Sequence, residues 1–155
     1  MTGARGVLGV GLDLVDVGSF AAQLDVVGST MATSTFTAAE LAEADTVGRD
    51  RPADGLARAR RLAGPFAAKE AFVKAWSTAR LGRAPALSEL RMLDVEVLND
   101  PWGRPFLRPS GDTGAAVLES LGAVEVHLSI THDGPVAAAV VVLAEAGGPS
   151  AVDRP

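Results

Sequence analysis

Three charged side chains lie in stretches of sequence that are otherwise apolar. Asp13 interrupts the run VLGVGLDLVDV at residues 7–17, and Glu70 and Lys74 lie four residues apart in a run rich in alanine and phenylalanine. A buried carboxylate is costly unless it is hydrogen-bonded, ion-paired or bound to a metal. Because Mg²⁺ binds one or two carboxylates together with phosphate oxygens and water, we identify Asp13 and Glu70 as candidate Mg²⁺ ligands and Lys74 as a candidate phosphate contact.

The same residues also have simpler structural interpretations. Asp13 can hydrogen-bond to nearby backbone or face water at the end of a strand. On a helix, Glu70 and Lys74 are i,i+4 neighbours, and such a surface ion pair is worth ~0.2–0.5 kcal/mol. Asp16 lies three residues after Asp13 and points to the opposite face of a strand, so we do not pair the two carboxylates.

A cluster of hydrogen-bond donors ends the last predicted hairpin. Residues 129–133 read Ser-Ile-Thr-His-Asp, and hydroxyl groups beside an imidazole suit the binding of an oxyanion. A Ser/His/Asp catalytic triad is disfavoured, because Ser129 and His132 fall on opposite faces of one strand and no nucleophile elbow surrounds Ser129.

The composition excludes several classes of site and of protein. The 155 residues contain no cysteine and two histidines, which excludes thiolate nucleophiles, Cys-ligated zinc and a three-histidine metal site within one chain. No apolar run approaches the ~20 residues of a membrane span, and residues 1–6 are too short and polar for a secretory signal. We expect a reduced, cytoplasmic protein with one domain over residues 1–155, its core at about 7–144 and a loose tail at 145–155.

Charge is distributed unevenly along the chain. The net charge is −5, which argues against a general nucleic-acid binder, yet residues 49–83 carry nine basic and three acidic side chains. This segment indicates either an acidic partner or ligand, or a solvated helix face with surplus arginine.

The first half of the chain predicts one strand and several helices. The apolar run at 7–17 predicts a buried strand, and residues 18–32 are partly helical in pattern. Residues 36–44 predict a helix with a capping box between Thr37 and Glu40. A loop is expected at 46–56, followed by a helix at 65–80 that begins at Pro65, since proline suits the first helical position.

The second half predicts two antiparallel strand pairs. Alternation predicts strands at 93–97 and 106–108 around a turn at 99–105, then a helix at 113–121 that ends at Gly122. Residues 124–131 and 135–144 form the clearest hairpin, with the turn at 132–135. The order of elements indicates an α+β fold with antiparallel sheet.

Taken together and in order, these stretches resemble holo-acyl-carrier-protein synthase, the small 4′-phosphopantetheinyl transferase family. The resemblance covers about residues 7–144. The matching stretches are Gly9-Val10-Gly11-Leu12-Asp13-Leu14-Val15, Phe36-Thr37 with Glu40, Phe66-Ala67-Ala68-Lys69-Glu70-Ala71-Phe72-Val73-Lys74-Ala75, Gly103-Arg104-Pro105 and Leu128-Ser129-Ile130-Thr131-His132.

The resemblance implies transfer of the phosphopantetheine arm from coenzyme A to a serine of an acyl carrier protein, with release of 3′,5′-ADP. Asp13 and Glu70 would hold Mg²⁺ against the coenzyme A pyrophosphate. Lys74 would contact that phosphate and help to take the serine proton, although a Mg²⁺-bound water or Glu70 are alternative bases. Phosphoryl transfer needs positioning and charge neutralisation rather than a covalent nucleophile, which is consistent with a chain that has no cysteine.

The resemblance also implies an antiparallel sheet packed on a long helix and a trimer with sites between subunits. A further coenzyme A contact is expected at Ser77, in the stretch after the long helix. The residues that would reach a neighbouring subunit's coenzyme A are Arg104, Pro105, Thr131 and His132.

Two departures from the family pattern leave alternatives open. Pro65 replaces an arginine that is expected to anchor a coenzyme A phosphate, and Arg60 or Arg61 are possible substitutes. Residues 77–83 lack a glycine-rich pattern. A non-catalytic subunit that binds coenzyme A or the carrier protein, and a Mg²⁺-dependent hydrolase of nucleotide-like pyrophosphates, therefore remain alternative functions.

Overall fold

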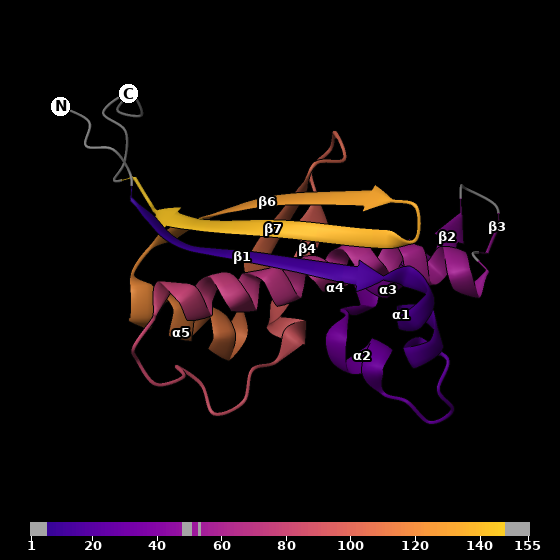
Figure 1. The fold of residues 1–155 in the computed structure, drawn as a ribbon, viewed down its shortest axis with the longest axis horizontal. Helices are drawn as coiled ribbons and strands as arrows, with labels where there is room; N and C mark the ends of the chain where they lie inside the picture. Colours follow the sequence, from indigo (N-terminus) through magenta and orange to yellow (C-terminus); the bar gives the residue numbers. More distant parts are fainter. Residues whose placement is uncertain (1–5, 48–50, 53, 148–155) are drawn as a thin grey trace.

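The computed structural model describes residues 6–47, 51–52 and 54–147. A three-stranded sheet lies over one long helix, with shorter helices around it (Figure 1). The predicted loose tail falls largely at residues 148–155, outside the described residues, as do residues 48–50 and 53 of the predicted loop at 46–56.

The main sheet consists of β1 (Val7–Asp16), β6 (Val124–Asp133) and β7 (Val136–Glu145), in the order β1-β7-β6. Both strand pairs are antiparallel, and β6 and β7 form the predicted hairpin. Gly134 in its turn has a φ of 53°, a conformation that glycine adopts without steric cost. The antiparallel α+β fold that the sequence predicted is confirmed.

Helix α4 (Gly55–Ala79) packs against β1 and β7 and begins ten residues earlier than predicted. Pro65 was expected to start this helix but lies inside it, where it removes the amide that would bond to the carbonyl of Arg61. The earlier turns are stable because Asp54 caps them, accepting a 2.7 Å hydrogen bond from the amide of Ala57, and because Leu62 is buried. Tertiary packing thus overrides the local signal of the proline.

The remaining elements of the first half lie around α4. They are α1 (Val17–Leu24), α2 (Met31–Thr35), α3 (Ala38–Asp45), β2 (Thr46–Val47) and β3 (Arg51–Pro52). The two-residue strands β2 and β3 pair within the segment expected to be a loop. The capping box of α3 is present as predicted, with Thr37 and Glu40 bonding to each other's backbone amides.

The second strand pair, β4 (Val95–Asn99) and β5 (Pro105–Pro109), is followed by α5 (Gly111–Leu121). The predicted strand at 93–97 starts late, because residues 92–94 form the 3-10 turn η1 (Met92–Asp94). The carboxylate of Asp94 accepts hydrogen bonds from the amide and hydroxyl of Thr113 and is therefore used to hold the start of α5.

The contact between β1 and α4 is a close approach of two backbones. A Cβ atom on Gly9 would lie 2.1 Å from the carbonyl oxygen of Ala75, and one on Gly11 would lie 1.8 Å from that of Ala71. Both alanines are fully buried. Thr78 completes the contact, since its hydroxyl bonds to the backbone amide and carbonyl of Val10. Only glycine on β1 and small residues on α4 permit this packing, which determines where the next residues of β1 lie.

Candidate functional site

Asp13 lies two residues beyond Gly11, on the face of β1 that meets α4. Its Oδ1 atom is 2.8 Å from the Nζ atom of Lys74, which also donates a 3.1 Å hydrogen bond to the carbonyl of Leu12. The Asp13 side chain is 15% exposed and that of Lys74 is 51% exposed. The ion pair of Lys74 is therefore formed between helix and strand, and not with Glu70 as in the simpler i,i+4 interpretation.

Glu70 lies one turn before Lys74 and is half-buried. Burial raises the pKa of its carboxyl group, the nearby charge of Asp13 raises it further, and Lys74 acts in the opposite direction. Two carboxylates that repel each other beside one cation form a site that attracts a second positive charge. The structure therefore brings the three charged residues singled out from the sequence into one cluster.

An open hollow of about 360 Å³ lies over this cluster and is lined by Asp13, Glu70, Phe66 and the first turns of α1. Asp16 lines it too, but its Oδ1 atom accepts a 2.7 Å hydrogen bond from the amide of Ser19 and caps α1. Asp16 therefore serves as a helix cap, although it lines the same hollow as Asp13. Among the described residues, no group of three or more His, Cys, Asp or Glu side chains could hold a metal ion.

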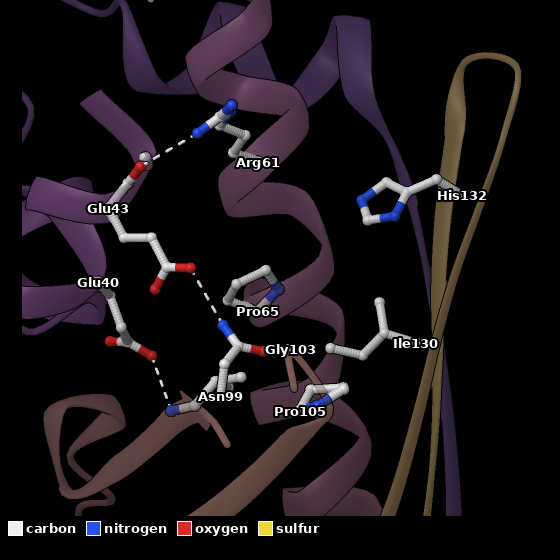
Figure 2. A pocket seen from close by; sticks show the side chains of 11 residues that line it. Glu40, Glu43, Arg61, Pro65, Asn99, Gly103, Pro105, Ile130 and His132 are labelled. Carbon is white, nitrogen blue, oxygen red and sulfur yellow. Dashed lines mark hydrogen bonds between the residues drawn. The ribbon is translucent and has the colours of Figure 1, made fainter. Parts of the chain in front are cut away.

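A second hollow of about 360 Å³ lies on another side of α4 (Figure 2). Its floor is apolar, with Pro65, Pro105 and Ile130, and its rim carries charged and amide side chains, among them Arg61 and Asn99. Asp13, Glu70 and Lys74 do not line it. Pro65, the residue that replaces the expected arginine, thus contributes an apolar surface to this wall.

His132 comes from β6 and lines the second hollow from the side opposite Glu43 (Figure 2). Its Nε2 atom is 3.2 Å from the carbonyl oxygen of Arg60. Because a carbonyl only accepts, this hydrogen bond requires the proton on Nε2 and leaves Nδ1 as the free nitrogen. Gly64 makes room for the imidazole, since a Cβ there would lie 2.9 Å from its Cε1 atom. Thr131 precedes His132 and is exposed.

Of the other predicted contacts, Pro105 also lines the second hollow, whereas Ser77 lies elsewhere. Arg104 donates a 2.6 Å hydrogen bond from Nε to Asp100, and Pro105 follows it at the start of β5. Ser77 is exposed near the end of α4 and lines a separate, mainly apolar hollow with Trp76, Arg80 and Leu87. Within one chain, the proposed metal ligands and the proposed coenzyme A contacts therefore do not form one continuous site.

Sequence reasoning missed a buried ion pair between Lys69 and Glu40. The Nζ atom of Lys69 donates to the Oε2 atom of Glu40 at 2.9 Å and to the carbonyl oxygens of Thr35 and Met92 at 2.8 and 3.1 Å. Burial lowers the pKa of Lys69, while the carboxylate of Glu40 acts against this shift. The available signal was a lysine in the apolar run Phe66–Phe72, together with a glutamate already assigned to a cap.

Much of the positive charge of residues 49–83 is used within the fold. Arg58 pairs with Asp45 at 2.5 Å, and Arg61 donates to the backbone carbonyls of Glu43 and Thr46 near the end of α3. Lys69 is fully buried. A basic face for an acidic partner is therefore smaller than the sequence indicated, with Arg60 as an exposed member. Among the described helices, none has the length and hydropathy needed to span a membrane.

Comparison with curated proteins finds relatives over most of the chain. A holo-[acyl-carrier-protein] synthase of Nocardia farcinica is 43% identical over 141 residues, which is 91% of this chain and 90% of that protein. One of Mycobacterium tuberculosis is 44% identical over 138 residues, 89% of this chain and 97% of that protein.

Solved structures give the same result. An ACPS–CoA complex of Chronobacterium ammoniagenes superposes with a TM-score of 0.77 at 42% identity, covering 87% of this chain and 95% of that one. A holo-(acyl-carrier-protein) synthase of Bacillus anthracis in complex with CoA (3′,5′-ADP) gives a TM-score of 0.64 at 30% identity, covering 92% and 100% of the two chains. These findings confirm the predicted family and enzyme class.

The sequence model of the 4′-phosphopantetheinyl transferase superfamily matches residues 9–140 of this chain. This segment includes the β1–α4 crossing, the Asp13–Glu70–Lys74 cluster and the β6–β7 hairpin with His132. The fold, the relatives and the matched segment agree, and the chain belongs to the 4′-phosphopantetheinyl transferase superfamily.

Proposed function

We propose that the protein transfers the 4′-phosphopantetheine arm of coenzyme A to a serine of an apo acyl carrier protein, in a Mg²⁺-dependent reaction that releases 3′,5′-ADP. The observation that carries this proposal is the cluster of Asp13, Glu70 and Lys74, which the glycines of β1 bring together beside an open hollow. The names of its relatives and the coenzyme A complexes of similar structures support the same reaction.

The residues present fit a Mg²⁺ ion. Asp13 and Glu70 would supply two carboxylates, and the open hollow leaves the other positions to pyrophosphate oxygens and water, which is the ligand set Mg²⁺ favours. When bound, the ion would neutralise charge on the pyrophosphate. The raised pKa of Glu70 fits this role, since a neighbouring divalent cation relieves the repulsion between the two carboxylates.

The reaction breaks a phosphorus–oxygen bond of the pyrophosphate and forms one to the serine oxygen. Lys74 is paired with Asp13 and half of its side chain is exposed, so its ammonium can contact a phosphate and offset charge on the leaving group. The serine proton requires an acceptor within hydrogen-bond reach, and the candidates at this cluster are Lys74, Glu70 and a water that Mg²⁺ would bind. Phe66 and Phe20 line the hollow and give it an apolar side.

We further propose a homotrimer in which each active site lies between two subunits. Val10, Leu12 and Leu14 point away from α4 and are at least half exposed. Their cross-strand partners Val142, Val140 and Ala138 extend the same face of the sheet. A contiguous apolar face of this kind indicates a protein interface. Packing of these faces would allow Arg104, Pro105, Thr131 and His132 of one subunit to reach coenzyme A at the Asp13 hollow of another. Sedimentation equilibrium at micromolar concentration tests the assembly, and a monomer would contradict it.

The activity is tested by incubating the protein with apo carrier protein, coenzyme A and Mg²⁺, and then weighing the carrier. We expect the mass of one phosphopantetheine to be added, and no addition when Mg²⁺ is chelated. If several carriers gain no mass while calorimetry still detects coenzyme A binding, the protein is a non-catalytic binding subunit. Breakdown of coenzyme A without any carrier would instead identify a pyrophosphate hydrolase. A reduced, cytoplasmic location and a single domain remain part of the proposal.

A further inference from the structure

The turn between β4 and β5 is held rigidly by one side chain. The Oδ1 atom of Asp100 accepts 2.9 Å hydrogen bonds from the amides of Trp102 and Arg104, and its Oδ2 atom accepts from Nε of Arg104 at 2.6 Å. These bonds lower the pKa of Asp100. Gly103 has a φ of 81° and donates from its amide to the carbonyl of Asp100. The backbone of the turn is thus fixed before any ligand binds.

This rigid turn presents an indole ring to solvent. Trp102 is 78% exposed, and the guanidinium carbon of Arg104 lies 5.1 Å from the centre of its ring. In contrast, Trp76 is 5% exposed and donates from Nε1 to the hydroxyl of Ser120. In Figure 1 the β4–β5 turn projects beyond the main sheet. The core does not explain Trp102, because the side chain contributes little buried surface to the fold.

The position of the indole relates it to the second hollow. Gly103 and Pro105, on either side of Arg104, line that hollow together with His132 and Arg61 (Figure 2). The surroundings therefore offer a flat aromatic surface next to cationic and hydrogen-bonding side chains. A ligand that joins a planar base to phosphate groups matches this combination, because bases stack on aromatic rings and phosphates bind to arginine.

We propose that Trp102 stacks on the adenine ring of coenzyme A and sets the affinity for the nucleotide part of that substrate. The proposal rests on the transfer reaction proposed above and adds a residue that no motif of the sequence indicated. Arg104 holds the indole from one side through the cation–π contact, and the exposed part of the ring receives the base. The rigid turn lowers the entropic cost of this stacking.

The test compares the wild-type protein with Trp102→Leu and Trp102→Phe variants, using 3′,5′-ADP as the probe. The chain has two tryptophans and no tyrosine, so its intrinsic fluorescence reports on Trp102 and the buried Trp76 alone. We expect 3′,5′-ADP to quench the wild-type emission with saturation. We expect the quenching to be lost in Trp102→Leu, and the affinity measured by calorimetry to fall about tenfold, with partial recovery in Trp102→Phe.

Steady-state kinetics then distinguish stacking on the adenine ring from a contact with the carrier protein. KM for coenzyme A should rise about tenfold in Trp102→Leu, while KM for the carrier protein and for a phosphopantetheine donor that lacks the adenosine group stays unchanged. A rise in KM for the carrier alone would assign Trp102 to protein docking and overturn the proposal. Equal 3′,5′-ADP affinity in wild type and Trp102→Leu would overturn it while leaving the transfer reaction intact. If wild type binds neither 3′,5′-ADP nor coenzyme A, the proposed function itself fails.

Discussion

Lys69 and Lys74 lie five residues apart on α4, and each pairs with a carboxylate from another element. The surroundings of the two pairs are opposite. Lys69 and Glu40 are 0% and 3% exposed, and besides each other their polar atoms have hydrogen-bond partners in α2, η1, β4 and the N-cap of α3. Lys74 and Asp13 are 51% and 15% exposed and lie beside a hollow. The first pair is enclosed on every side, whereas the second is open on one side.

The difference shows that one helix carries both an ion pair that stabilises the fold and an ion pair that is a candidate for binding substrate. A buried pair whose bonds are all satisfied has no capacity left for a ligand, and breaking it leaves an uncompensated charge in the core. An exposed pair contributes little to stability, but its charges can be redirected toward a substrate. We therefore expect changes at Lys69 to affect folding and changes at Glu70 and Lys74 to affect turnover.

The largest effect is expected from Lys69→Met. This change leaves the Glu40 carboxylate buried without its cation, and we expect the free energy of unfolding to fall by about 3–5 kcal/mol, measured by urea denaturation. A double variant, Lys69→Met with Glu40→Leu, should recover part of the loss, because no unpaired charge remains in the core. A loss below about 1 kcal/mol in the single variant would contradict the structural role of the pair.

The next effect is expected from Glu70→Gln. Loss of one carboxylate of the cluster should lower kcat by at least ~10³-fold, since a divalent ion supplies several kcal/mol of charge stabilisation to such reactions. The free energy of unfolding should stay the same or rise, because the partial burial of a charged carboxylate and its repulsion from Asp13 are both removed. Transfer at the wild-type rate would exclude Glu70 from the mechanism, and an unfolded variant would show that the open cluster is also structural.

Lys74→Met is the matched control for Lys69→Met, since both replace a lysine of α4 by methionine, at positions five residues apart. We expect kcat to fall by about 10²-fold while the free energy of unfolding changes by less than about 1 kcal/mol. Both quantities are measured on the same preparations. If stability falls as far as it does in Lys69→Met, the proposed assignment of Lys69 to folding and of Lys74 to turnover is wrong.

The smallest effect concerns pH and is measured without divalent ions. The pKa of Glu70 is raised in the folded protein, so the native state takes up a proton at a higher pH than the unfolded chain does. As pH falls from neutrality through the raised value toward the ordinary 4.5, Glu70 therefore adds to the free energy of unfolding. Because Glu70→Gln lacks this titration, the free energy of unfolding of wild type should rise relative to that of the variant as pH falls, and a relative fall would contradict the prediction.

Local patterns predicted the elements and residues whose signals lie within a few positions of one another. The strand at β1 is an apolar run, the first strand of the β6–β7 hairpin shows apolar alternation, and the α3 capping box depends on residues three apart. Asp13, Glu70 and Lys74 were found because each is a charge in an apolar run. Their joint location then followed from the two glycines of β1, which are also visible in the sequence.

Predictions were wrong or incomplete where distant contacts decide the outcome. Pro65 is a good first residue of a helix, but Asp54 and the buried Leu62 continue α4 in front of it. Lys69 looks like any lysine of a charged helix until α2, α3 and η1 surround it. The site of Ser77 also depends on the segment after α4, which folds back to form the wall of a different hollow.

The sequence by itself determined the family, the antiparallel hairpin and the identity of the charged cluster, because each depends on residue types at short, regular spacing. Only the tertiary structure decided which lysine is buried in the core and which is half exposed beside Asp13. It also decided that Trp102 is exposed on a rigid turn. Burial and ion pairing arise from elements far apart in the chain, and their energies are set by the solvent that the assembled fold excludes.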